Sequence, residues 1–283
     1  MSYKIILDSC GELAEEMKND PRFERVALTL TVGDYEILDD DNFDQKTFLK
    51  KVSECPTCPH SACPSPEAFK QAGVCEADHI YYITLSSHLS GSYNSACIAK
   101  EMLEEEYPNK KVVVVDSLSA SVGLTQIARR IVEMEEKGID FEQIVERVGT
   151  LRNRMLTYFV LDNLETLRKN GRMSRVTELI ASTLNLKPVM AADMGEIVKI
   201  SQTIGSKKAL AKMTELITAE IDKLKDATEK SIMISHCNCE KRAELVKKLM
   251  QEKFPGLQIT ILDTAGISSM YANDGGIILT VMA

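Results

Sequence analysis

Strand and helix patterns alternate through the first 155 residues, and this alternation constrains the fold more than any other feature of the chain. Short apolar runs at residues 4–8, 80–85 and 111–115 indicate buried strands, and a helical pattern follows each of them. Alternation of this kind is the signature of a mostly parallel sheet with helices on both faces. We therefore expect an N-terminal α/β domain over residues 1–155.

The second half of the chain, residues 156–283, has a different strand pattern. Apolar runs at 187–191 and 197–200 surround a turn at residues 193–196, which indicates an antiparallel pair. Further apolar runs separated by helical stretches follow. We expect a C-terminal α/β domain with a mixed sheet.

Two segments of the first half are predicted from composition. Residues 23–32 are apolar and rich in β-branched side chains, which predicts one continuous strand. Residues 54–66 hold four of the eight prolines, which predicts a loop. A helix is expected to begin at Pro66, because Ser65 can cap it and proline suits the first helical position.

Charge and hydropathy exclude several classes of protein. The net charge is −8 and there is no block of Lys and Arg, which argues against a nucleic-acid-binding footprint. No run approaches 18 consecutive apolar residues, so no stable membrane insertion is expected. The first residues show no apolar core of a signal peptide. The cytoplasm is the expected location.

A turn rich in small hydroxyl residues follows the apolar run at 80–85. It contains Ser90, Gly91 and Ser92, and a helical pattern begins near Tyr93. Free N–H groups and the dipole at a helix start attract anions. Serine is also common in turns and as a helix cap, so the residues alone leave an anion site and simple capping equally open.

Two other strand ends carry polar turns, Asp8-Ser9 and Asp116-Ser117. Right-handed crossovers bring the carboxyl ends of parallel strands to one edge of a sheet, where ligands of such folds bind. An Asp8–Asp116 pair could hold a metal ion, but capping of the turns is the favoured interpretation, and no metal or cofactor is expected.

Four of the eight cysteines, Cys55, Cys58, Cys63 and Cys75, lie within 21 residues. Cys55 and Cys58 form a C-x-x-C pair. The spacing to the other cysteines matches no usual zinc pattern, and the pair lies in the proline-rich segment rather than between a strand and a helix. Reduced thiols are expected, with a metal or redox role as the alternative.

Several motifs together resemble the DegV family, over essentially the whole chain. Residues 87–96 read S-H-L-S-G-S-Y-N-S-A, close to the family's S-x-L-S-G-T-Y-Q-S-A. Residues 61–65 read S-A-C-P-S, where the family has T-S-Q-P-S. Residues 164–174 resemble L-E-Y-L-x-K-G-G-R-I-S, and residues 184–189 resemble L-N-I-K-P-I.

The resemblance implies a bacterial protein that buries a long-chain, palmitate-like fatty acid in a cleft between two α/β domains. Lipid transport or fatty acid metabolism would be its role. Carried over from the family, the carboxylate would be held by Ser61 and Ser90, with backbone N–H groups near Gly91 and Ser92, and the tail would lie in an apolar tunnel. His88, Arg172 and Asp116 are secondary candidates for the same site.

Two departures from the family concern the carboxylate end. Tyr271 stands where the family has a histidine; it can still donate a hydrogen bond but is neutral. Ile204 and Ser206 stand where the family often has arginines, just before Lys207. Some members of the family serve as the binding subunit of bacterial fatty acid kinase. These departures weaken that role more than they weaken fatty acid binding.

Two other functions compete with fatty acid carriage. The first is an enzyme that acts on a phosphate or acyl group at the Ser90–Ser92 turn, with His88 as a base. The chain has no G-x-S-x-G elbow and no P-loop, so a binding protein is favoured. The second is a scaffold or regulatory protein whose lipid is incidental.

Overall fold

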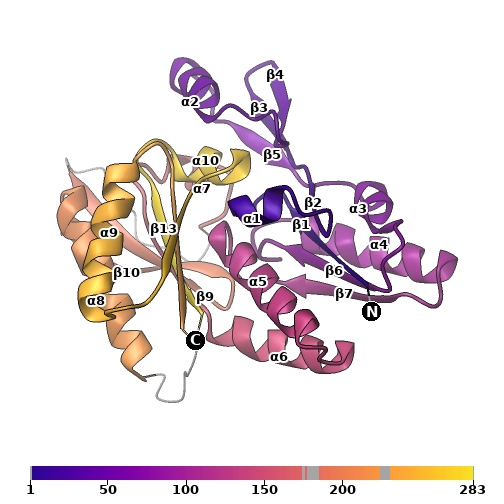
Figure 1. Ribbon diagram of the computed structural model, residues 1–283. Helices are drawn as coiled ribbons and strands as arrows, with labels where there is room; N and C mark the ends of the chain where they lie inside the picture. Colours follow the sequence, from indigo (N-terminus) through magenta and orange to yellow (C-terminus); the bar gives the residue numbers. More distant parts are fainter. Residues whose placement is uncertain (1, 174–175, 177–184, 224–229, 283) are drawn as a thin grey trace.

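The computed structural model describes residues 2–173, 176, 185–223 and 230–282. Two sheets lie in separate lobes, and a small third sheet projects from one of them (Figure 1). Both lobes contain helices as well as strands, as an α/β fold requires. Ser174 and Leu184, at the ends of two of the motifs above, lie outside the described residues.

The first lobe contains a four-stranded parallel sheet, as expected. Its order is β2-β1-β6-β7, and every neighbouring pair is parallel. The strands are β1 (Tyr3–Asp8), β2 (Phe23–Val26), β6 (His79–Thr84) and β7 (Lys111–Asp116). Helices α3 (Pro66–Gly73), α4 (Ser92–Glu106), α5 (Val122–Glu136) and α6 (Phe141–Arg154) follow the strands.

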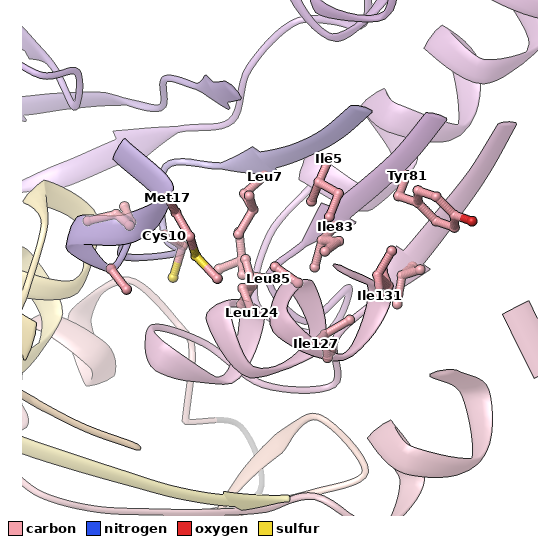
Figure 2. Close-up of a cluster of buried hydrophobic side chains, with 14 of the residues drawn as sticks. Ile5, Leu7, Cys10, Met17, Tyr81, Ile83, Leu85, Leu124, Ile127 and Ile131 are labelled. Carbon is pink, nitrogen blue, oxygen red and sulfur yellow. The ribbon is translucent and has the colours of Figure 1, made fainter. Parts of the chain in front are cut away.

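Alternating side chains of this sheet pack into two cores. Ile5, Leu7 and Ile83 point to the face covered by α5, where they meet Leu124 and Ile127 (Figure 2). Their neighbours along the strands point to the opposite face and pack against α3 and α4. Burial on both faces explains why these strands read as continuous apolar runs. The start of α3 is also as predicted, since Ser65 Oγ accepts a hydrogen bond from Ala68 N at 3.2 Å.

The second lobe contains the expected mixed sheet, in the order β10-β9-β8-β13-β11-β12. The strands are β8 (Leu156–Val160), β9 (Leu186–Asp193), β10 (Glu196–Ile204), β11 (Ser231–His236), β12 (Ile259–Asp263) and β13 (Ile277–Met282). Only β11 and β12 run parallel, and β9 and β10 form the predicted antiparallel hairpin. Helices α8 (Ser206–Lys223) and α9 (Glu240–Lys253) cover one face.

The other face of the mixed sheet looks toward the first lobe. Gln126, on α5, donates from Nε2 to Thr280 O at 3.1 Å, so α5 bonds to β13 as well as packing on its own sheet. Helix α6 ends at Arg154 and β8 begins at Leu156. A domain boundary at 155–156 agrees with this chain path but stays a prediction.

The prediction of one strand over residues 23–32 is wrong. The segment forms β2 and then β3 (Thr29–Val32), which belong to different sheets. The ladder breaks at Leu28, whose N–H donates to Ser9 Oγ at 3.0 Å and whose carbonyl accepts from Asp39 N. Apolar composition continues through this break, so periodicity alone could not reveal it.

The small third sheet has the order β4-β3-β5. Strand β4 spans Tyr35–Leu38 and β5 spans His60–Ala62, so the predicted loop at 54–66 contains a strand. Helix α2 (Gln45–Glu54) lies between them in the chain. We call residues 28–62 the insert; it projects at the top of Figure 1, next to the short helices α7 (Glu165–Lys169) and α10 (Gly266–Ala272). A further short helix, α1 (Glu15–Lys18), follows β1.

Candidate functional site

The polar turns after β1, β6 and β7 meet at one edge of the parallel sheet, as predicted. Asp8 Oδ2 accepts a hydrogen bond from Leu85 N at 2.8 Å, which joins the first two turns. Asp116 Oδ1 accepts from Ser87 N at 3.2 Å, which joins the last two. The hydrogen bonds lock this edge into a fixed surface.

A cavity lies between this edge and the inner face of the mixed sheet. Residues of the parallel-sheet turns form one wall, and β8, β10, β13 and α10 contribute the other. Most lining side chains are apolar. They are Cys10, Leu85, Leu89, Ala120, Phe159, Leu161, Leu167, Ala192, Ile197, Ile267, Ala272 and Ile278, with Gly195 between them.

The hairpin turn between β9 and β10 closes the cavity on one side. Ser86 Oγ donates to Gly195 O at 2.7 Å. Gly195 has a φ of +87°, and a Cβ there would lie 2.5 Å from Ser86 Oγ. Glycine is therefore required for this close approach, because a side chain would push the turn away from the wall.

Serine and threonine hydroxyls in the cavity wall are bonded to one another. Ser119 Oγ and Thr157 Oγ1 lie 2.7 Å apart. Ser121 Oγ donates to Glu12 Oε2 at 2.8 Å and lies 2.6 Å from Ser235 Oγ. Because these hydroxyls bond to one another and to Glu12, they are not available to a ligand, and the wall presents mainly apolar surface to the cavity.

The structure brings the predicted Ser61 and Tyr271 together. Their hydroxyl oxygens lie 3.4 Å apart, although 210 positions separate the residues in the chain. Ser61 comes from β5 of the insert, and Tyr271, which lines the cavity, comes from α10. Two hydroxyls this close together can both donate to one acceptor that lies alongside the pair, within reach of each.

The predicted Ser90–Ser92 turn begins α4, with Gly91 as the residue before the helix. A Cβ at Gly91 would lie 3.1 Å from the sulfur of Cys63, so the end of the insert passes close to this turn. Ser90 Oγ accepts from Ser92 N at 3.2 Å. The first turn of α4 still has N–H groups beyond the reach of intrahelical acceptors.

The side chain of Ser92 points into the protein beneath this turn. Its side chain is fully buried, and its hydroxyl bonds to Asp8 and lies 3.1 Å from Ser90 Oγ. The hydroxyl therefore fixes the turn from inside. Burial raises the pKa of Asp8 to about 7, against the lowering effect of these hydrogen bonds.

The three secondary candidates have different surroundings. Arg172 lines the cavity, and its guanidinium donates to Leu89 O at 3.1 Å and to the carbonyl of Asn170. His88 is about half exposed and lies 3.4 Å from Glu196 across the hairpin. Asp116 caps its own turn, since Oδ1 also accepts from Leu118 N at 3.0 Å.

Asp8 accepts backbone N–H groups on both carboxylate oxygens and Asp116 accepts two on Oδ1, which agrees with the capping interpretation of the sequence. Within the described residues, no group of three or more His, Cys, Asp or Glu side chains is arranged to hold a metal ion. All eight cysteines are unpaired. Cys55 and Cys58 stand between α2 and β5.

Sequence reasoning missed two buried carboxylates, Glu12 and Asp39, that underlie the site. Glu12 supports the cavity wall through Ser121, and Asp39 bonds to the start of α10. Acidic residues in turn-like segments normally indicate exposed caps, so only burial distinguishes these two. Most apolar lining residues were missed for a similar reason, because core and cavity side chains have the same composition.

No helix in the described part of the chain is long and apolar enough to cross a membrane.

Comparisons with known proteins cover nearly the full chain. The family model described as "Uncharacterised protein, DegV family" matches residues 2–281. A DegV domain-containing protein of Streptococcus gordonii is 33% identical over 283 residues, covering 99% of this chain and 98% of the relative.

Among solved structures, a DegV family protein of Ruminococcus gnavus with vaccenic acid is similar, with a TM-score of 0.94 and 46% identity over 99% of both chains. The fatty acid kinase (Fak) B3 protein of Streptococcus pneumoniae, loaded with linoleic acid, has a TM-score of 0.88 and 30% identity. Its match covers 100% of this chain and 99% of that one. Since the family model and these relatives span the whole fold, the chain belongs to the DegV family.

Proposed function

We propose that the protein binds a long-chain fatty acid in the cavity, with the tail along the mixed sheet and the carboxylate at the Ser61–Tyr271 end. The observation that carries this proposal is a cavity with mostly apolar walls whose lining includes Tyr271, with the hydroxyl of Ser61 beside the Tyr271 hydroxyl. An elongated apolar chain with one polar terminus complements such a space. Cys63, two residues after Ser61, lies against Gly91, so we place the Ser90–Ser92 turn on the same side of the site as a further source of donors.

The tail would supply most of the binding free energy. Each buried methylene contributes about 0.8 kcal/mol, so a chain of some sixteen carbons gains far more than one or two hydrogen bonds. The carboxylate then sets the direction of the ligand, because a charged group inside the apolar part would lack hydrogen-bond partners. Hydroxyl and backbone donors suit a carboxylate because such bonds are charge-assisted.

Known relatives support this ligand class. The Ruminococcus gnavus protein was solved with vaccenic acid and the Streptococcus pneumoniae protein with linoleic acid. At 46% identity, the first resembles this chain over the whole fold. A binding protein is therefore favoured over an enzyme at the Ser90–Ser92 turn, where His88 pairs with Glu196 rather than with a serine.

Presentation of the bound acid to a kinase subunit is the finer proposal, and the Fak B3 relative favours it. Ser206 and Ile204, which stand where the family often has arginines, have different surroundings. Ser206 Oγ donates to Asp162 Oδ1 at 2.8 Å, and Ile204 is 64% exposed. Acyl-phosphate formation from bound fatty acid, ATP and a fatty acid kinase catalytic subunit would support presentation; its absence with a competent kinase would contradict it.

Substitutions at the polar end test fatty acid binding directly. Ser61→Ala and Tyr271→Phe each remove one hydroxyl without filling the cavity. We expect each to weaken binding of cis-vaccenate about 10- to 150-fold, since one hydrogen bond to a charged group is worth roughly 1.5–3 kcal/mol. Affinities would be measured by calorimetry on delipidated protein.

The control is Ser53→Ala, which removes an exposed hydroxyl on α2 that bonds only to Lys50 O. It should bind like wild type. Wild-type protein that carries no acyl chain after purification, and shows no heat of binding with added vaccenate or palmitate, would refute the proposed function. Enzymatic turnover of an acyl or phosphate substrate would favour the alternative.

A further inference from the structure

Helix α10 is short, yet it carries Tyr271 to the polar end of the cavity. It spans Gly266–Ala272, and four of its residues line the cavity. A helix of seven residues has few internal hydrogen bonds, so contacts at its ends must set its position. The position of the Tyr271 hydroxyl depends on those contacts.

One buried carboxylate holds the start of α10. Asp39 Oδ1 accepts from Gly266 N at 2.7 Å, and Asp39 Oδ2 accepts from Ile267 N at 2.8 Å. The Asp39 side chain is fully buried. Two charge-assisted bonds from one carboxylate to successive N–H groups fix both the place and the direction of the helix start.

The start of the helix packs closely against Asp39 and Leu30. A Cβ at Gly266 would lie 2.7 Å from the carboxyl carbon of Asp39 and 2.8 Å from Leu30 Cδ1. Burial raises the pKa of Asp39, while the two backbone bonds and the charge of Arg25 lower it. Asp39 N itself donates to Leu28 O at 2.9 Å, so the carboxylate is anchored in the insert.

The insert also carries the other hydroxyl of the pair. Strand β5 pairs with β3, with Ser61 opposite Leu30. A second bridge joins the same parts, because Gln45 Nε2 donates to Thr264 O at 2.9 Å and to Ser269 Oγ at 3.2 Å. The insert and α10 are thus bonded to each other at both Asp39 and Gln45.

We infer that Asp39 is a positioning residue for the fatty acid carboxylate, because through α10 it holds the Tyr271 hydroxyl opposite Ser61. Asp39 does not touch the ligand; its effect passes through Tyr271. This inference rests on the proposed function. It adds to that function the residue, Asp39, that sets the position of the Tyr271 hydroxyl.

A double-mutant cycle between Asp39 and Tyr271 tests the inference. Asp39→Asn keeps one acceptor oxygen but places an amide NH₂, which is a donor, where the second backbone N–H needs an acceptor. We expect Asp39→Asn to weaken vaccenate binding about fivefold in the wild-type background. In the Tyr271→Phe background it should have less than a twofold effect, because the hydroxyl it positions is already gone.

A matched control is Asp78→Asn. Asp78 also accepts from a backbone N–H, that of Ser2 at 3.1 Å, but it lies before the start of β6, at the opposite end of that strand from the turns near the cavity. The affinity of this variant should equal that of wild type. Fluorotyrosine labelling gives a second measurement: the ¹⁹F resonance of Tyr271, assigned by its absence in Tyr271→Phe, should shift in Asp39→Asn and not in Asp78→Asn.

If Asp39→Asn does not fold, Gln45→Ala replaces it in the same cycle, with an expected twofold to threefold loss that also vanishes in the Tyr271→Phe background. Equal losses in both backgrounds, or an unchanged affinity in Asp39→Asn, would overturn the inference and leave fatty acid binding intact. A wild-type protein that binds no fatty acid would overturn the proposed function, and this inference with it.

Discussion

Ala192→Phe is expected to abolish fatty acid binding while the protein remains folded. Ala192 lies on β9, lines the cavity and is partly exposed within it. A phenyl ring placed there fills space that several methylene groups of the ligand would occupy. Because each of those groups contributes about 0.8 kcal/mol, their exclusion removes most of the affinity.

Thermal unfolding with added ligand measures this effect. A ligand at 100 times its dissociation constant stabilises a protein by about 2.7 kcal/mol, which for a chain of this size raises the melting temperature by on the order of 5–10 °C. Wild type should show this rise with vaccenate, and Ala192→Phe should show none.

Ala211→Phe is the matched control, because Ala211 is exposed on α8, which covers the other face of the mixed sheet. It should respond to vaccenate like wild type. An undiminished rise in Ala192→Phe would mean that the ligand binds outside this cavity. A loss of folded structure in the absence of ligand would instead indicate that the ring disrupts the hairpin, and the smaller Ala192→Leu would then be compared.

The sequence predicts the parallel sheet well because β1, β6 and β7 are buried on both faces and therefore read as apolar runs. It does not predict the exchange of sheets at Leu28, since a hydrogen bond from Leu28 N to Ser9 Oγ replaces a ladder bond without any change of composition. Helix α10 is missed because its segment has no periodic apolar face; it is buried on nearly every side.

For the site, short motifs indicate Ser61 and Ser90, and the structure adds the contact of Ser61 with Tyr271. That contact forms because the insert packs against α10. No local sequence pattern predicts this packing, since the two segments are far apart in the chain. Asp39 shows the limit most clearly. It opens a run of three aspartates that reads as an exposed loop, yet its own side chain is fully buried while that of Asp41, two residues later, is exposed.

Glu12 is expected to make the stability of the protein depend on pH. It is buried beneath the cavity wall, where Ser121 Oγ donates to one carboxylate oxygen and Ala265 N, at 3.4 Å, to the other. Burial raises its pKa from 4.5 to about 7, more than these hydrogen bonds lower it. Between these values the native state keeps a proton that the unfolded chain releases. The free energy of unfolding therefore falls as pH rises through this window, and the loss is complete above about pH 7.

Glu12→Gln should remove this loss, because the amide is neutral at every pH and can still bond to Ser121 and Ala265. We expect equal stability of variant and wild type near pH 4.5, and an advantage of about 3 kcal/mol for the variant at pH 8. Some pH dependence should persist, since Asp8 has a similarly raised pKa. Urea unfolding of delipidated protein from pH 4.5 to 8 measures the difference.

The exposed control Glu15→Gln should follow wild type throughout. Parallel curves for Glu12→Gln and wild type would mean that Glu12 is charged in the native state across the whole range, and that its hydrogen bonds outweigh its burial.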